Sequence, residues 1–294
     1  MKYISLFIIG LLTTCLLSSC EDVIQIDVAP AESQLVIDAF ISNTSKAQTI
    51  RLTKTVPYFE EGDAPTISGA EIVLKNETTG REFIFTDTQT NGQYTWTPAR
   101  NDSIGKVGDV FLLTVRYDNN EYQASSHLNR TTKIDSITVK YEKESGDDKA
   151  GYYARFYGYD LAGQKDYYWI KSFKNNQYQT KLLTYATNAI GGTDDIEGTT
   201  DSLAFIEPIS KAITDGDDPF QLGDKVRVEI WSITQETIEF FSQAEAQINN
   251  GGLFARPPEN LRTNFTNKTD ASKKPVGWFS TSVVSELEGM VEDK

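Results

Sequence analysis

One cysteine of this chain is placed where its sulfur could be acylated. Cys20 ends the tetrapeptide Leu-Ser-Ser-Cys, which closes an apolar run from Tyr3 to Leu17 that follows Lys2. A positive start, a short apolar stretch and small residues at the end are the features of a secretory signal peptide. A branched aliphatic residue and two small residues suit a peptidase that cuts before a lipidated cysteine. We therefore expect residues 1–19 to be removed and Cys20 to carry lipid.

This segment has two other interpretations. The apolar run has about fifteen residues, short of the roughly 20 that cross a bilayer as a helix, so a permanent membrane span is disfavoured. An ordinary secretory peptide cut after Ser19 would leave Cys20 as a free thiol. Each methylene buried in lipid contributes roughly 0.8 kcal/mol, so several acyl chains such as palmitate would hold the mature chain on a membrane.

Catalytic chemistry has few candidate residues here. His127 is the only histidine, and the second cysteine, Cys15, lies in the segment expected to be removed. The sequence lacks zinc-ligand clusters, a phosphate loop, a dinucleotide fingerprint and a Gly-x-Ser-x-Gly elbow. A pair of carboxylates could still catalyse glycoside hydrolysis, since acidic residues are numerous. We expect no enzyme activity, no catalytic residues, no metal site and no cofactor.

Aromatic residues gather in one stretch of the chain and offer a binding surface. Eight of them lie close together: Tyr152, Tyr153, Phe156, Tyr157, Tyr159, Tyr167, Tyr168 and Trp169. Alternate residues of a strand point to opposite faces, so some rings should be buried and others exposed. Exposed Tyr167, Tyr168 and Trp169 would form a platform for sugars or peptides, and the alternative is that the rings pack in a core.

Two acidic segments could present oxygen atoms to calcium. They are residues 193–197 and 215–218, which together hold Asp194, Asp195, Glu197, Asp215, Asp217 and Asp218. Neither matches the twelve-residue calcium loop, which needs acidic positions 1, 3 and 5 and a glutamate at 12. We interpret both as solvated loops.

The elements that must position these residues are mostly strands. Between residues 34 and 131, short β-rich segments alternate with turns, at 34–41, 49–53, 70–74, 82–85, 94–96, 110–117 and 121–124. About seven short strands in roughly 100 residues are typical of an immunoglobulin-like or transthyretin-like sandwich. A tether, residues 20–33, would join this sandwich to the lipid.

A second β-rich domain is expected over residues 132–294, after a linker at 129–134. Its strands are predicted at 137–141, 151–159, 166–173 and 226–231, with a final strand at 275–284. One helix is predicted at about 233–249, with Ser232 and Gln235 as its capping pair. Ile238, Phe241, Glu245 and Ile248 would mark its buried stripe. The fold class is therefore mostly β, with one packed helix.

Composition limits the partners. Hydrophobic residues make up 39% of the chain and aromatic residues 11%, which excludes a disordered protein. The net charge is −14, and removal of Lys2 with the leader makes it −15. This acidity disfavours nucleic acid and anionic lipid head groups as partners. Without Cys15 the mature chain can form no internal disulfide, so its stability must come from packing.

Several separate segments give the chain a resemblance to a known family. They are Cys20 to Ile24 with Leu35 to Ile37, Leu52 to Thr55 with Pro57 to Phe59, Ser68 to Ala70, Phe254 with Pro257 to Leu261, and Val276 to Phe279. In this order they resemble a family of Bacteroidota outer-membrane lipoproteins, the domain of unknown function 4249.

The resemblance implies a cellular location and a partner protein. Such lipoproteins are typically encoded near TonB-dependent outer-membrane transporters, which implies an accessory role in ligand capture or uptake. Glu21 and Asp22, directly after the lipidated cysteine, resemble the signal that sends lipoproteins of that phylum to the cell surface. We expect a non-catalytic lipoprotein on the outer membrane that works with a β-barrel transporter. The alternative is a surface adhesin or structural lipoprotein that binds a glycan or another polymer.

Overall fold

The structure is a computed structural model, and it describes residues 33–56, 62–179, 183–187, 204–205, 209–249 and 261–292. The chain divides into two compact units, Met1–Glu32 and Ser33–Lys294, and every described strand and helix belongs to the second. The predicted leader, Cys20, Glu21, Asp22 and nearly all of the tether lie outside the described residues.

Two sheets form a sandwich around the first core. One has the order β15 (Val276–Ser282), β1 (Leu35–Ser42), β2 (Gln48–Lys54), β5 (Gln93–Trp96). The other has the order β14 (Thr266–Asn267), β7 (Asn120–His127), β6 (Val110–Tyr117), β3 (Glu71–Asn76), β4 (Glu82–Phe85). Alternation along β1 buries Ile37, Ala39 and Ile41 against β6 residues such as Leu113, because successive side chains point to opposite faces.

A third sheet and a hairpin enclose a second core. The sheet has the order β11 (Gln177–Tyr178), β10 (Tyr167–Lys174), β13 (Lys225–Ile233), β16 (Val284–Met290), and β12 (Thr184–Thr187) pairs with β10. The hairpin joins β8 (Ile134–Glu142) to β9 (Gly151–Gly158), and a short 3-10 helix, η2, covers Ile209–Lys211. Phe156 of β9 packs with Tyr168 and Ile230 of the sheet, and all three are fully or almost fully buried.

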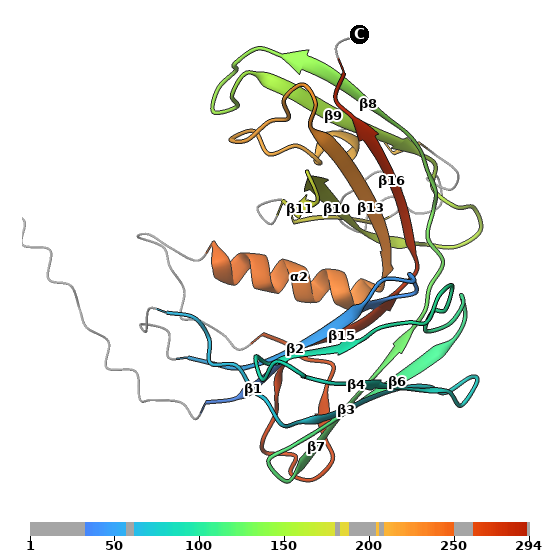
Figure 1. Ribbon diagram of the computed structural model, residues 1–294, viewed down its shortest axis with the longest axis vertical. Coiled ribbons are helices and arrows are strands. Elements are labelled where there is room, and N and C mark those ends of the chain that lie inside the picture. Colours follow the sequence, from blue (N-terminus) through green and yellow to red (C-terminus); the bar gives the residue numbers. More distant parts are fainter. Residues whose placement is uncertain are drawn as a thin grey trace, which may run out of the picture. The chain divides into compact units, whose positions relative to one another are not determined.

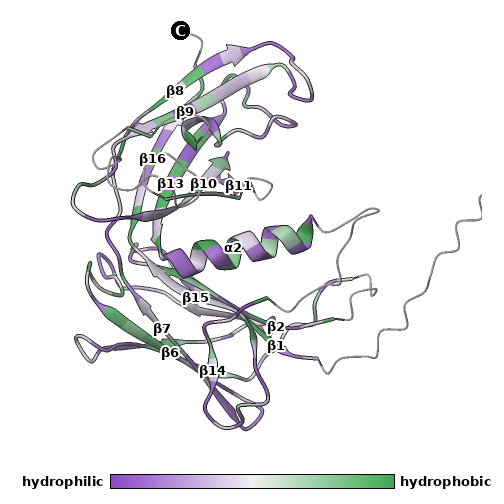
Figure 2. Ribbon diagram, turned by 180° about the vertical axis from the view of Figure 1, so that it is seen from behind, coloured by the Kyte–Doolittle hydropathy of each residue, from purple (hydrophilic) through white to green (hydrophobic). Residues whose placement is uncertain are grey.

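The helix α2 (Gln235–Ile248) lies between the β10–β13 sheet and the β15–β1–β2 sheet (Figure 1). Hydrophobic and hydrophilic residues alternate along it (Figure 2). Its N-cap is Thr234, whose side chain accepts a hydrogen bond from the backbone of Thr237, so the predicted cap at Ser232 is wrong. The Ser232 side chain instead donates to the carbonyl of Asn129 and accepts from the backbone N–H of Val283.

The buried stripe of α2 also differs from the prediction. Thr237, Phe240 and Phe241 are its buried residues, whereas Ile248 is 83% exposed. The neighbours decide the stripe: Phe240 stacks on Trp278 of β15, and Phe241 stacks on Phe40 of β1. The helix therefore packs on the β15–β1 sheet through its first two turns.

The chain returns to its first sandwich near its end. β15 pairs in parallel with β1, from Val36 beside Val276 to Ser42 beside Ser282, and β14 pairs with β7. The predicted boundary at 131/132 therefore does not separate the sheets, because residues 266–282 complete the first sandwich. The predicted final strand also divides at Val283, after which β16 joins the third sheet.

The mostly β fold, the sandwich and the single described helix confirm the predicted fold class. The predicted linker 129–134 is held by specific contacts, since Arg130 pairs with the buried Asp166 and Asn129 bridges to Ser282. In the described part of the chain, no helix has the length and apolarity to cross a membrane.

Candidate ligand-binding site

The paired strands β10 and β13 present two chemically different faces. Tyr168, Ile170, Val228 and Ile230 point into the second core. The residues between them point the other way, toward β1 and α2, and the register places Trp169 beside Trp231 and Lys171 beside Glu229. Strict alternation thus puts two indole rings and a lysine next to one another on a single face.

The ammonium of Lys171 sits over both indole rings. Its Nζ lies 3.7 Å from the ring centroid of Trp169 and 3.6 Å from that of Trp231. A cation over an aromatic face is attracted by the ring quadrupole, more strongly as water is removed. Among the described residues, Lys171 makes no hydrogen bond and no ion pair. The three ammonium donors are therefore available to a ligand.

Burial lowers the pKa of Lys171 to about 7, and the negative charge of Asp38 opposes this shift. Asp38 lies on β1, and burial raises the pKa of its carboxyl, against the charges of Lys171 and Arg51. Yet the Asp38 side chain is exposed to solvent. Many protein atoms therefore lie near the Asp38 carboxyl, although water still reaches it. We name Trp169, Lys171, Trp231 and Asp38 the Trp-Lys cluster.

A pocket of about 170 Å³ adjoins this cluster and shares Trp231 with it. Its other wall is the end of β1 and the turn into β2. The lining residues are Phe40, Ser42, Thr44, Lys46, Ala47, Gln48, Thr49, Glu229 and Trp231. The side chains of Ser42, Thr44 and Gln48 hydrogen-bond to one another, so this wall is held in place beside the aromatic residues Phe40 and Trp231.

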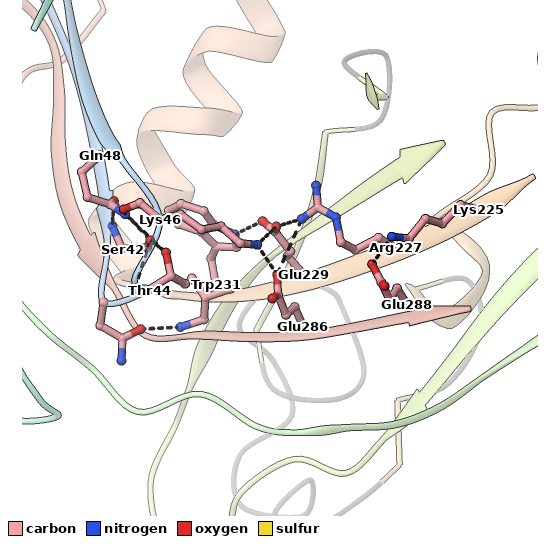
Figure 3. A network of polar contacts seen from close by, with 12 residues as sticks. Ser42, Thr44, Lys46, Gln48, Lys225, Arg227, Glu229, Trp231, Glu286 and Glu288 are labelled. Atoms are coloured by element: carbon pink, nitrogen blue, oxygen red, sulfur yellow. Dashed lines mark hydrogen bonds and ion pairs between the residues drawn. The ribbon is translucent and has the colours of Figure 1, made fainter. Parts of the chain in front are cut away.

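The ring of Trp231 is held in place by a buried carboxylate. Glu229, whose side chain is 7% exposed, accepts a hydrogen bond from Trp231 Nε1 at 2.8 Å and pairs closely with Arg227 (Figure 3). Lys46 reaches the same carboxylate from the β1–β2 turn at 3.7 Å. The guanidinium of Arg227 in turn lies 3.6 Å from the ring centroid of Phe173. This network holds Trp231 and Glu229 in place and connects them to the β1–β2 turn through Lys46.

Aromatic contacts hold the remaining wall. The ring centroids of Phe40 and Trp169 are 5.2 Å apart, and those of Trp169 and Phe241 are 4.9 Å apart. Strands β1 and β10 and helix α2 therefore meet at one point. Edge-to-face pairs of this kind contribute about 0.5–1.5 kcal/mol each beyond the area they bury.

Comparison with known proteins assigns the chain to a family. Residues 21–288 match the model of the domain of unknown function DUF4249. The chain belongs to this family. A comparison with curated proteins found no match. The match begins directly after Cys20 and contains the whole Trp-Lys cluster, so the candidate site lies within the DUF4249 domain.

The predicted platform of the DUF4249 domain is only partly where the sequence placed it. Tyr168 is fully buried, and its hydroxyl donates to Asp160 at 2.6 Å, so it is a core residue and not part of an exposed surface. Tyr167 is half-buried, and its hydroxyl donates to Gln235 of α2. Trp169 is 8% exposed and belongs to the Trp-Lys cluster.

Sequence reasoning missed Asp38, Lys171 and Trp231 as site residues. A signal exists for two of them, because Asp38 and Lys171 are charged residues inside otherwise apolar strands. Nothing local shows that these two strands face each other, however. Trp231 lies in a strand that was predicted, but no neighbouring residue in the sequence indicated that it belongs to a site.

The acidic segments give the DUF4249 domain no described cation site. Residues 193–197 lie outside the described residues. In the second segment, Lys174 pairs with Asp218 at 2.7 Å, and Lys149 donates to the backbone carbonyl of Asp217. No group of three His, Cys, Asp or Glu side chains in the described ranges is arranged to hold a metal ion. His127 is exposed at the end of β7.

Proposed function

We propose that this chain is a non-catalytic lipoprotein of the outer membrane that captures a ligand at the Trp-Lys cluster and works with a TonB-dependent transporter. Lipid on Cys20 holds it at the membrane, and Glu21 with Asp22 directs it to the cell surface. The folded unit, Ser33–Lys294, does the binding.

One observation carries the binding role. The ammonium of the half-buried Lys171 and the carboxylate of the exposed Asp38 face the same region, and neither has a hydrogen-bond partner among the described residues. Leaving charged groups desolvated and unpaired costs free energy. A protein that keeps such groups beside two indole rings and a polar pocket has the parts of a binding site, because a ligand supplies the missing partners.

The lipid anchor is tested on the protein from its native membrane. We expect mass spectrometry to find residue 20 as the first residue, with acyl chains on its sulfur and amine. A Cys20→Ser variant should lose both the lipid and the membrane fraction. An unmodified thiol, or a leader still attached, would contradict the anchor.

The transporter partnership is tested by co-purification. The chain, tagged at its C-terminus and extracted with a mild detergent, should bring down a β-barrel protein in near-equal amount. The Cys20→Ser variant is the control, since it should recover little. Repeated recovery of the lipoprotein alone would count against the partnership.

A second function, adhesion to a polymer, is favoured by a different surface. Tyr157 and Tyr159, on or next to β9, are 39% and 59% exposed, and two positions separate them, so they point to the same face. Exposed tyrosine rings suit stacking against sugars. If this function holds, binding on a glycan array is lost in a Tyr157→Ser/Tyr159→Ser variant and kept in Lys171→Met.

A further inference from the structure

We propose that the ligand of the Trp-Lys cluster is a small organic acid, whose carboxylate is bound by Lys171 while its body lies in the pocket beside Trp231. This assignment rests on the proposed binding function and specifies its ligand class.

The charges of the groups facing the site favour an anion. The titratable groups on the packed elements are Asp38 on β1, Lys46 on the β1–β2 turn, Arg51 on β2, Tyr178 on β11, Glu229 on β13, and Glu245 on α2, which accepts a hydrogen bond from Tyr185. Lys46 is compensated by its ion pairs with Glu229 and Glu286. Glu229 is neutralised by Arg227, and Arg51 lies beside Asp38 in the register of β1 and β2. Asp38 is acted on by the positive charges of both Lys171 and Arg51, so one carboxylate faces two cations here and the three groups together carry a net positive charge.

The aromatic rings also favour an anionic ligand. Indole faces attract the ammonium of Lys171 but supply no hydrogen-bond acceptor, so they hold the side chain in place and leave its donors unused. A carboxylate accepts such donors in short, charge-assisted hydrogen bonds. It would also favour the protonated form of Lys171, which burial disfavours.

Pocket size limits the ligand body. A volume of about 170 Å³ is below the range of about 300–1,000 Å³ usual for drug-sized ligands. The pocket therefore admits one small ring or one end of a longer molecule. Ser42, Thr44 and Gln48 line the pocket and hydrogen-bond to one another, so they form a fixed polar edge, and Phe40 and Trp231 contribute aromatic surface.

The experiment uses two pairs of probes that differ in the carboxylate: glucuronate with glucose, and benzoate with benzyl alcohol. Each is titrated into the full chain, purified from its host in detergent, with calorimetry and tryptophan fluorescence as readouts. We expect at least one carboxylate to bind about tenfold more tightly than its neutral counterpart. Equal affinity, or no binding, in both pairs would overturn the assignment.

Variants tie the effect to Lys171. Lys171→Met should weaken carboxylate binding about tenfold or more, while Lys140→Met, a change at an exposed lysine of β8, should leave it unchanged. Lys171→Arg should keep binding and show affinity that does not change between about pH 6 and about pH 8, whereas the wild-type affinity falls as the pH rises. Thermal unfolding of each variant checks that it is folded. Carboxylate binding that survives in a folded Lys171→Met variant would refute the proposal.

The two proposals fail separately. If the β-barrel protein co-purifies with both wild type and Lys171→Met but no probe pair discriminates, the ligand class is wrong and the transporter role stands. If carboxylates bind through Lys171 but no barrel is ever recovered, the transporter role is wrong and the ligand class stands.

Discussion

Gly277 lies directly beside Ile37 where the parallel strands β15 and β1 meet. Its φ is +104°, a conformation that side chains rarely adopt, and a β-carbon built on it would overlap the carbonyl oxygen of Ile37. Only glycine lets the two backbones approach this closely. The segment Val276 to Phe279, one of those in which the sequence resembles the family, is therefore the place where β15 pairs with β1 near the start of the described chain.

Replacing Gly277 with alanine should destabilise the protein by about 2–4 kcal/mol, because the backbone must change conformation and move away from β1. Chemical denaturation measures the difference. Gly289→Ala is the matched control: Gly289 also lies in a paired strand, but no atom comes within 4 Å of its built β-carbon. Its effect should stay within about 0.5 kcal/mol. Equal losses in the two variants would show that the close approach is unimportant.

Arg227 should matter far more to stability than Lys46, although both pair with Glu229. The Glu229 side chain is 7% exposed, so Arg227→Met leaves a buried carboxylate short of charge, at a cost of about 3 kcal/mol. Lys46 is 54% exposed, and Lys46→Met should cost no more than about 1 kcal/mol. Urea titration compares the two. The double variant Arg227→Met/Glu229→Gln should regain part of the lost unfolding free energy, because it has no buried carboxylate. If it regains none, the loss comes from the missing packing of Arg227 on Phe173.

Lys171 should make stability depend on pH in a definite direction. Its pKa is about 7 in the folded chain and ordinarily 10.5, so between these values the unfolded chain binds a proton that the folded chain does not. The free energy of unfolding should therefore rise from about pH 7 toward about pH 10 by more in wild type than in Lys171→Met. Below pH 7 the two curves should run parallel. Parallel curves over the whole range would show that Lys171 is as well solvated as any surface lysine.

The two neighbouring tyrosines of β10 should respond differently to loss of their hydroxyl. Burial and the adjacent Asp160 raise the pKa of Tyr168, and Tyr168→Phe takes one donor from the buried Asp160 carboxylate. We expect a loss of about 1–3 kcal/mol in thermal or chemical unfolding. Tyr167→Phe removes an exposed hydrogen bond to Gln235 and should change stability by less than about 0.5 kcal/mol. The reverse order would place Tyr168, not Tyr167, at the surface.

Local patterns in the sequence predicted most of the elements. The alternation in Leu35 to Ile41 predicted β1, and the run from Val226 to Trp231 predicted the centre of β13, because a strand with one buried face repeats every two residues. The helix was predicted at about 233–249 and spans Gln235–Ile248. Its buried stripe was predicted only in part: Phe241 is buried as expected, but Phe240 was missed because it is buried by Trp278, a contact that no local pattern reveals.

The sequence by itself determined the mostly β class and the position of the helix, and it alone carries the prediction of an apolar leader that ends before Cys20. Only the tertiary structure decided that β15 pairs with β1, that Tyr168 is buried, and that Asp38 faces Lys171 across the site. The physical reason is that burial and strand alternation act on neighbouring residues, whereas strand pairing and site assembly depend on contacts between distant segments, which many arrangements of the same strands could satisfy.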